Sequence, residues 1–507
     1  MAQVIKQNLS SRALLICITS LIYIGSLGLL WSFPNNQALS HDEAVYLTKA
    51  RSWVQGTPAD EYRAYRPIGM VVAGSIFLPW GQSENNLRLF GVFSGALVVT
   101  FIFLLFQSVF DLRVGIVVSS VVALSGLFME QAPLFQNDLL SSGLLIGTLW
   151  LLSLSFRSFG KSKFIYLAPF FCAISFYLRY GVASTLFIIG IITLIFFYFA
   201  KIKDYSYKHL YRSTLIFIIL LIPHFYYSIN IYGNAFEVLL RAGEAAGREY
   251  LGEGLIQYIK WIPEELSGRV AGTLMIIGGL FTIVSLFFHK HLSPKNVQAL
   301  WLGFIGVISM SLTGLLVHAE HRYVFLPIIL LSGVGYAVIF NLLNKYSKIV
   351  SNVFFVCSLF MIGYFGVGTY QTTVVSFQNK IDNRSFYTEA ASYITSNIDD
   401  DEKCAVWSAA FRPEISWYSK CFTIGLAEDK YLFEKHFYVH FRNIRYAIYF
   451  TNLEVRQLYP GNSEEYGVIL DEVYRAETGD RLGDLVIYSV NKKSLSDQNM
   501  IDEEVYE

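Results

Sequence analysis

The chain has 507 residues, of which 54% are hydrophobic, 16% are aromatic and only 15% are charged. Soluble proteins average about 25% charged residues, so this composition excludes an ordinary soluble enzyme. The formal net charge of zero gives no electrostatic reason to expect a nucleic-acid partner. We therefore predict a polytopic α-helical membrane protein.

Apolar runs long enough to cross a bilayer, which takes about 17–25 residues, recur along the chain. The first run lacks a small-residue cleavage site, so it is predicted to be an anchor and not a signal peptide. Residues 68–80 are too few to cross and are predicted to be a re-entrant or interfacial segment. In all we predict about eleven spans, near 13–33, 87–110, 113–130, 138–156, 164–178, 181–200, 213–232, 270–289, 299–317, 322–343 and 349–369.

Lys and Arg are concentrated in alternate loops. Cytoplasmic loops carry an excess of these residues, so the basic loops and the N-terminus are predicted to be cytoplasmic. An odd number of spans then puts the C-terminal part outside the cell. We predict a transmembrane domain at 1–374, including an outer loop at 34–86, and an extracytoplasmic domain at 375–507, in a plasma membrane protein. The basic loops are 157–163, 201–212, 289–295 and 344–348.

The stretch SHDEAVYLTKARSW, residues 40–53, directly follows the first span. Ser40 and Glu43 have the spacing of a capping box, which favours a structural role for Glu43 at a helix start. Asp42 is not needed for that cap, so it is a candidate catalytic carboxylate. Tyr46 lies one turn further along the same helix face. Trp53 is predicted at headgroup depth on a helix lying on the membrane.

The outer loop ends in a basic and proline-containing segment, QGTPADEYRAYRP, residues 55–67. Its candidate substrate-binding residues are Arg63, Tyr65 and Arg66. Proline disfavours helical backbone at the preceding residue, so Pro67 is expected to present the Arg66 guanidinium at the membrane surface.

Acidic and basic residues from distant loops fall on the same predicted outer face. They are Asp138, Arg179, Glu320 and Arg322, in addition to those of the first outer loop. Carboxylates beside arginines suit acid–base chemistry next to an anion such as phosphate. A purely structural role stays open, with Asp138 at a helix N-terminus and the arginines snorkelling to the interface.

The histidines lack a metal-ligand spacing such as HExxH. His318 and His321 beside Glu320 are a weaker candidate for holding a cation, so a divalent cation is a candidate cofactor and metal dependence is open. His224 follows Pro223 within a predicted span, and we expect it to hydrogen-bond a backbone carbonyl that the proline leaves free.

The chain after about residue 375 alternates between strand and helix patterns, which predicts a small α/β domain. The helices are expected at 413–419 and 427–437. The strands are expected at 404–409, 422–425, 446–450, 467–470 and 485–490. Cys404 and Cys421 both fall in this domain, and a disulfide between them is permitted if the domain is exported.

Taken in order, these motifs resemble those of the GT-C superfamily of membrane glycosyltransferases. The resemblance is to the branch that contains protein O-mannosyltransferases and the lipid A aminoarabinose transferase, families 39 and 83, and it covers residues 1–370. Each motif is short, but their order, spacing and shared side are fairly specific. The matching segments are HDEAVY (41–46), YRPIG (65–69), QNDLL (136–140), LRYG (178–181) and HRYVFLP (321–327).

The resemblance implies a cell-envelope enzyme that transfers a sugar from a polyprenyl-phosphate donor to an acceptor hydroxyl on the outer face, with inversion. It implies Asp42 as the general base, and Arg66, Arg179 and Arg322 as the cations that bind the donor phosphate. Glu43 would shape the acceptor side, and Asp138 would orient a basic residue or the acceptor, or support a metal. Segment 68–80 and neighbouring spans would form a groove for the lipid tail. Tyr46, Arg63, Tyr65 and Glu320 are expected to contact substrate.

The sequence departs from the family in two respects. Arg66 and Arg179 stand where the aminoarabinose enzymes carry lysine, and the chain has no room for the β-trefoil domain of eukaryotic protein mannosyltransferases. The acceptor is therefore open between lipid, glycan and protein. Rival interpretations are a lipid-linked sugar flippase or transporter, an O-antigen ligase or polymerase, and a structural or interaction protein.

Overall fold

The computed structural model falls into two compact units. The first comprises residues 1–35, 63–73 and 85–377, and the second comprises 36–62, 74–84 and 378–507. The residues that the structure describes are 2–59, 66–199, 206–244, 249–262, 264–285, 287, 294–398, 404–426, 443–453, 463, 467–478 and 481–492.

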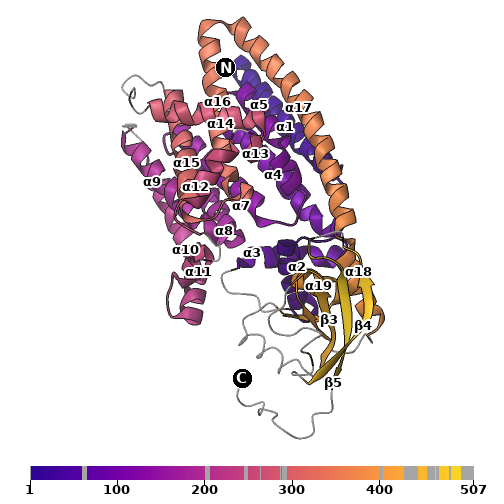
Figure 1. Cartoon of the computed structure of the whole chain (residues 1–507). Helices are drawn as coiled ribbons and strands as arrows, with labels where there is room; N and C mark the ends of the chain where they lie inside the picture. Colours follow the sequence, from indigo (N-terminus) through magenta and orange to yellow (C-terminus); the bar gives the residue numbers. More distant parts are fainter. Residues whose placement is uncertain are drawn as a thin grey trace. The chain divides into compact units, whose positions relative to one another are not determined.

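The first unit is a helical bundle (Figure 1). Short 3₁₀ segments, among them Lys163–Leu167, Tyr180–Val182 and η5 (His321–Val324), precede several of its helices. Its helices are α1 (Ala2–Trp31), α4 (Glu84–Val109), α5 (Leu112–Ala123), α6 (Gly126–Gln131), α7 (Asn137–Arg157), α8 (Ala168–Leu178), α9 (Ala183–Phe199), α10 (Lys208–Tyr232), α11 (Glu237–Glu244), α12 (Glu253–Trp261), α13 (Glu264–Ser267), α14 (Arg269–Ser285), α15 (Pro294–Leu316), α16 (Phe325–Tyr346) and most of α17 (Lys348–Asn383).

Each of the eleven predicted spans overlaps apolar helical structure. Within the described residues, seven helices are long and apolar enough to cross a membrane, judged by length and composition. The helices at 112–123, 163–178, 180–196 and 269–285 are shorter, so the count of eleven stays a prediction. α17 has 36 residues and is about 54 Å long, which exceeds the roughly 30 Å of a hydrocarbon core.

The predicted span 113–130 is wrong as a single helix. α5 ends at Ala123, and a separate short helix, α6, begins at Gly126. The Ser125 side chain accepts a hydrogen bond from the Phe128 N–H and so caps α6. Hydropathy alone did not reveal this break because Leu124, Leu127 and Phe128 keep the run apolar.

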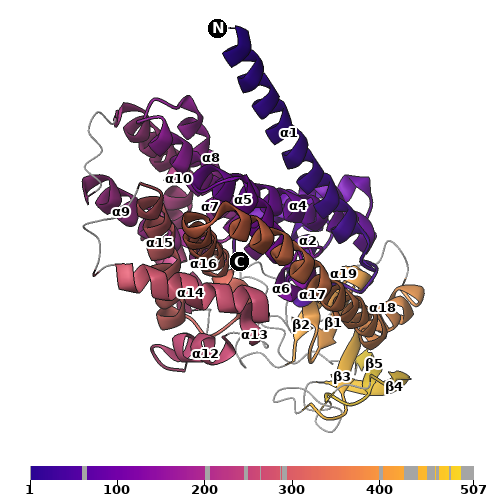
Figure 2. The same cartoon turned by 90° about the horizontal axis from the view of Figure 1, so that it is seen from above.

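Close backbone contacts between helices hold part of the bundle together. α16 lies beside α14 and α15, as Figure 2 shows from above. A methyl group added at Gly278 of α14 would clash with the Leu331 carbonyl of α16, and one added at Gly335 of α16 would clash with the Leu274 carbonyl of α14. Small residues that let helix backbones approach are typical of membrane helix interfaces.

The second unit contains one mixed five-stranded sheet in the order β2-β1-β3-β5-β4. β2, β1 and β3 run parallel, whereas β5 is antiparallel to both β3 and β4. The strands are β1 (Ala405–Ser408), β2 (Phe422–Gly425), β3 (Ile444–Phe450), β4 (Val468–Ala476) and β5 (Leu485–Lys492). All five predicted strands are found, and the small α/β fold is confirmed.

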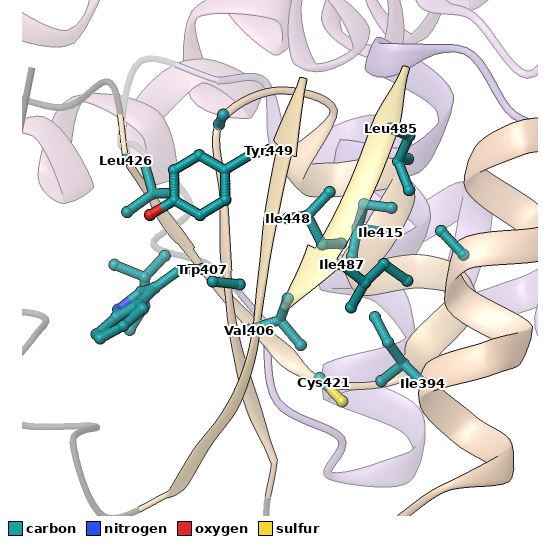
Figure 3. Packing of buried hydrophobic residues seen from close by; sticks show 14 of the residues in the cluster. Ile394, Val406, Trp407, Ile415, Cys421, Leu426, Ile448, Tyr449, Leu485 and Ile487 are labelled. Carbon is teal, nitrogen blue, oxygen red and sulfur yellow. The ribbon is translucent and has the colours of Figure 1, made fainter. Parts of the chain in front are cut away.

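Two helices pack on the sheet, α18 (Ser385–Ser396) and α19 (Arg412–Ser419), and the second matches the helix predicted at 413–419. In Figure 3, Ile394 of α18 and Ile415 of α19 lie against Ile448 and Ile487 of the strands, in a core cluster that contains no exposed member. A Cys404–Cys421 disulfide links the start of β1 to the start of β2, with the Cα atoms 5.0 Å apart. The helix predicted at 427–437 lies outside the described residues.

The helix predicted just after the first span is α2 (His41–Gln55), and it packs on α19 of the second unit. Arg51 is 1% exposed, and its Nη atoms donate to the carbonyls of Trp417 (2.6 Å) and Ser416 (3.0 Å). The buried face of α2 therefore contacts protein, whereas Trp53 is exposed. The domain boundary predicted at 374/375 divides the chain once, but the compact second unit also takes in 36–62 and 74–84.

Candidate functional site

A buried carboxylate binds two arginines within the first unit. Asp138 lies in the first turn of α7 and is 5% exposed. One carboxylate oxygen lies 2.6 Å from Arg179 Nη1, and the other lies 3.5 Å from Arg322 Nη1. The three residues come from loops separated by about 40 and 140 residues of sequence, and the structure brings them together as expected for a shared face.

Local hydrogen bonds explain why Asp138 and Arg179 meet. Asn137 Nδ2 donates to the carbonyl of Leu178 at 2.8 Å, which joins the start of α7 to the end of α8. One turn further, the hydroxyls of Ser141 and Ser175 are 2.9 Å apart and extend that contact. Arg179 caps α8 in an extended conformation, so its side chain leaves the helix beside Asp138.

Arg322 is held by a second set of contacts. Its Nε lies 3.2 Å from Glu320 Oε2. The Glu320 backbone N–H donates to the Tyr258 hydroxyl at 3.2 Å, and that hydroxyl lies 3.1 Å from the Glu320 carbonyl, to which it donates. Burial raises the pKa of Tyr258 to about 12, so this hydroxyl stays protonated at neutral pH. Glu320 was predicted to contact substrate, and in the structure it fixes Arg322.

Tyr323 supplies the surface on which both guanidinium groups lie. The Cζ atom of Arg179 is 4.3 Å from the centre of the Tyr323 ring, and that of Arg322 is 5.6 Å from it. Cation–π contacts of this kind hold planar guanidinium groups in a fixed orientation. Sequence reasoning did not assign a role to Tyr323 or to Tyr258. Tyr323 could have been selected as a candidate from the sequence, because it belongs to the HRYVFLP motif (321–327).

The segment that carries Arg66 also approaches Arg179. Pro67 precedes α3 (Ile68–Phe77), and the Tyr180 hydroxyl hydrogen-bonds to the backbone of Ile68. A Cβ added at Gly69 would lie 2.6 Å from the Tyr177 carbonyl oxygen, so only glycine allows this approach. The YRPIG and LRYG motifs are therefore adjacent. Arg66 is partly exposed, whereas Arg63 and Tyr65 lie outside the described residues.

The acidic pair of the first outer loop belongs to the second unit. Glu43 is fully buried, and its carboxylate accepts hydrogen bonds from the Ser40 N–H (2.9 Å) and the Ser40 hydroxyl (3.0 Å). The capping box is thus present. Asp42, one residue earlier, is partly exposed and does not serve this cap. Tyr46 is 5% exposed, so its ring is packed inside the unit.

The expectation that His224 hydrogen-bonds a backbone carbonyl is wrong. Both ring nitrogens of His224 lack a hydrogen-bond partner within the described residues, and the ring packs against Phe176 and Tyr180 in place of a backbone carbonyl. His318 Nε2 lies 3.6 Å from Glu320, but the His321 ring stacks on Trp261 at 4.1 Å. Among the described residues, no group of three His, Cys, Asp or Glu side chains is arranged to hold a metal.

The geometry can bind an anion. A guanidinium group carries five N–H donors in a fixed fork, and two such groups converge on Asp138. Arg179 and Arg322 are 18% and 23% exposed, so both reach solvent while their positions are fixed by buried partners. Fixed arginines suit bidentate recognition of phosphate.

The fold of this chain, a helical bundle with a small mixed sheet, resembles that of solved GT-C membrane glycosyltransferases. No protein-family model matches the sequence, and no curated protein matches it. The chain is similar to ArnT of Cupriavidus metallidurans bound to undecaprenyl phosphate, with a TM-score of 0.60 and 12% identity over 97% of this chain and 99% of ArnT.

A second similar structure is an oligosaccharyltransferase of Archaeoglobus fulgidus, with a TM-score of 0.58 and 13% identity over 86% of this chain and 69% of that chain. The same archaeal enzyme, AglB, in complex with an inhibitory peptide and a dolichol-phosphate gives a TM-score of 0.56 at 12% identity. These likenesses confirm the GT-C resemblance at the level of fold.

Proposed function

We propose that this chain is a membrane glycosyltransferase that uses a polyprenyl-phosphate-linked sugar as donor. The observation that carries the proposal is the pairing of buried Asp138 with Arg179 and Arg322 at one end of an apolar bundle of GT-C fold. The likeness to proteins bound to undecaprenyl phosphate and to dolichol-phosphate supports a lipid phosphate as the anion.

In the proposed reaction, the Asp42 carboxylate takes a proton from an acceptor hydroxyl. The hydroxyl oxygen attacks the anomeric carbon of the donor sugar, and the bond from that carbon to the phosphate oxygen breaks with inversion. The electron pair of that bond leaves on the polyprenyl phosphate. Asp42 is preferred to Glu43 as the base because both Glu43 contacts with Ser40 serve the helix cap.

The leaving phosphate gains negative charge in the transition state, and positioned cations stabilise that charge. Arg179 and Arg322 are proposed for this role because Asp138, Glu320 and Tyr323 hold them in place. Arg66 is proposed as the third cation, since α3 begins beside Tyr180. Asp138 thus orients basic residues, one of the roles expected for it.

The reaction is proposed to take place on the outer face of a plasma membrane, because the loops that bear the cluster alternate with the Lys- and Arg-rich loops. The acceptor is a lipid, a glycan or a protein that offers a hydroxyl group. A mannosyl donor is one member of the proposed donor class. The identity of the transferred sugar and the requirement for a divalent cation are to be measured in the transfer assay.

A transfer assay tests the proposal. Membranes containing the wild-type chain or Asp42→Asn are supplied with a panel of radiolabelled polyprenyl-phosphate sugars. We expect label to reach an acceptor with the wild type only, while Asp42→Asn still binds the donor. Near wild-type rates in Asp42→Asn would remove Asp42 as the base. Labelled lipid that moves between leaflets without any transfer would favour the flippase, and transfer of whole lipid-linked glycans would favour the O-antigen ligase.

A further inference from the structure

A cavity of about 460 Å³ lies within the first unit, beside the charged cluster. Residues of α5, α6, α13, α14 and α17 line it, together with His321. Its volume falls in the range of about 300–1,000 Å³ that is typical of small-molecule sites. His321 of the lining directly precedes Arg322 of the charged cluster in the chain.

The lining of this cavity contains both apolar and polar side chains. Leu124, which directly follows α5, and Ile362 and Phe365 of α17 are apolar. Glu130 and Gln131 of α6 are polar, as are Glu264, Glu265 and Ser267 of α13. A lining of both kinds fits an amphiphile, which has an alkyl chain and a polar head group.

Two polar atoms of the lining are buried without a partner. Ser267 is 6% exposed, and its hydroxyl makes no hydrogen bond within the described residues. The Gln131 side-chain carbonyl is also buried and unpaired there. An unsatisfied buried polar group costs about 1–3 kcal/mol, so both atoms favour a ligand that brings hydrogen-bonding groups.

The charge of the polar lining residues determines the kind of head group. Glu264 is paired with Arg269 at 2.7 Å, but Glu130 and Glu265 have no ion pair within the part of the chain that is described. Two uncompensated carboxylates repel an anionic head group. They accept strong hydrogen bonds from hydroxyl or ammonium groups.

We propose that this cavity binds the hydroxylated, non-anionic head group of a membrane amphiphile, such as a sugar on an alkyl chain. Ser267 and Gln131 contact its hydroxyls, and Glu130 and Glu265 exclude anions. The identification of the occupant as the sugar of the donor or of the acceptor rests on the proposed function. The binding of a hydroxylated head group in the cavity does not depend on it.

Photolabelling of the full chain in lipid nanodiscs tests the proposal. The probe is an alkyl glucoside with a diazirine in its chain, and the matched control probe carries a sulfate in place of glucose. We expect the glucoside to label peptides from 121–131 and 362–369 about tenfold more strongly than the sulfate, a difference of about 1.4 kcal/mol. Excess unlabelled octyl glucoside should compete. Equal labelling by both probes in the wild type would overturn the proposal.

Variants assign the effect to the named residues. Ser267→Ala should reduce glucoside labelling several-fold, and Glu130→Gln with Glu265→Gln should raise sulfate labelling towards that of the glucoside. Ser309→Ala is the matched control, because Ser309 is also buried and unpaired within the described residues but does not line the cavity. Labelling that neither variant changes would contradict the assignment. The wild-type probe ratio keeps the test valid if a variant fails to fold.

Competition distinguishes the two sources of the sugar. If the polyprenyl-phosphate sugar competes with the probe and the polyprenyl phosphate alone does not, the occupant is the donor sugar. If neither competes, the donor sugar is excluded as the occupant, and competition by a candidate acceptor glycolipid identifies the acceptor. Equal competition by the polyprenyl phosphate alone would overturn the proposal, because the cavity would then bind the phosphate or the tail. Absence of transfer with labelling intact would count against the proposed function alone.

Discussion

Individual side chains of the site owe their positions to partners that a local motif does not reveal. Asp138 was a candidate from its place at a helix start, and the structure adds that it contacts Arg179 and Arg322. Glu320 and Tyr258 fix one arginine, and Tyr323 supports both. The candidate residues that the sequence places in separate loops are therefore in contact with one another in a single charged cluster.

Asp138→Asn should leave both guanidinium groups without their shared carboxylate. Removing one partner of a buried ion pair costs about 3–5 kcal/mol, so we expect a clear loss of thermal stability and a large fall in transfer rate. Unfolding followed by intrinsic fluorescence measures the first effect. Glu237→Gln is the matched control, because it breaks the exposed Arg241–Glu237 pair, worth about 0.5 kcal/mol. A variant as stable as this control would show that Asp138 does not hold the cluster together.

Arg66→Ala should weaken donor binding and leave the fold intact, since Arg66 is partly exposed and precedes α3. Loss of one charge-assisted contact to phosphate is worth about 1.5–3 kcal/mol, or roughly a tenfold to hundredfold rise in apparent KM for the lipid donor. Initial rates over a range of donor concentrations measure it. Arg66→Lys should recover part of the affinity, because it keeps the charge. Unchanged donor affinity in Arg66→Ala would remove Arg66 from the phosphate site.

At the scale of elements, helix contacts decide where the motifs meet. The YRPIG segment reaches the LRYG segment because Gly69 lets α3 approach the end of α8, and Asn137 joins α7 to the same end. The loop helix predicted from the SHDEAVY segment is present as α2, but its buried face packs on α19. Amphipathicity predicts that a helix has a buried face and leaves open which surface buries it.

Gly69→Ala should displace α3 from α8, because the new methyl group would meet the backbone carbonyl of Tyr177, which cannot rotate away. We expect destabilisation of about 1–3 kcal/mol and a loss of transfer greater than the loss of folded protein. Gly279→Ala, where nothing lies within 4 Å, is the control and should behave like the wild type. Full activity of Gly69→Ala would show that the position of α3 does not matter for the reaction.

At the scale of the whole molecule, the described residues form two compact units that interleave along the chain. The second unit collects 36–62 and 74–84 from an early loop and builds its sheet from residues after 404. Asp42 and the Asp138 cluster therefore belong to different units. Hydropathy gives the order of the spans, but it does not assign a loop to a distant domain.

Cys404 and Cys421 test both the second unit and the predicted orientation. A disulfide closing a loop of this size contributes about 2–4 kcal/mol, so Cys404→Ser with Cys421→Ser should lower the stability of the unit by that amount. In intact cells, an impermeant thiol reagent should label the two cysteines only after reduction, as an extracytoplasmic disulfide requires. Cys17→Ser provides the control in a span. Labelling before reduction would contradict the bond, and labelling only after lysis would contradict the orientation.

The sequence by itself determined the class of the protein, the approximate positions of most of its apolar helices, the five strands, the capping box and the charged residues that the structure brings together in a cluster. These features follow from run length, periodicity and short-range spacing, which are local properties of a chain. Tertiary structure decided that Asp138 binds both arginines, that Tyr323 and Tyr258 support them, that α2 packs on α19, and that a cavity lies beside His321. Those features depend on contacts between residues far apart in sequence, and short-range sequence patterns do not specify which distant residues meet.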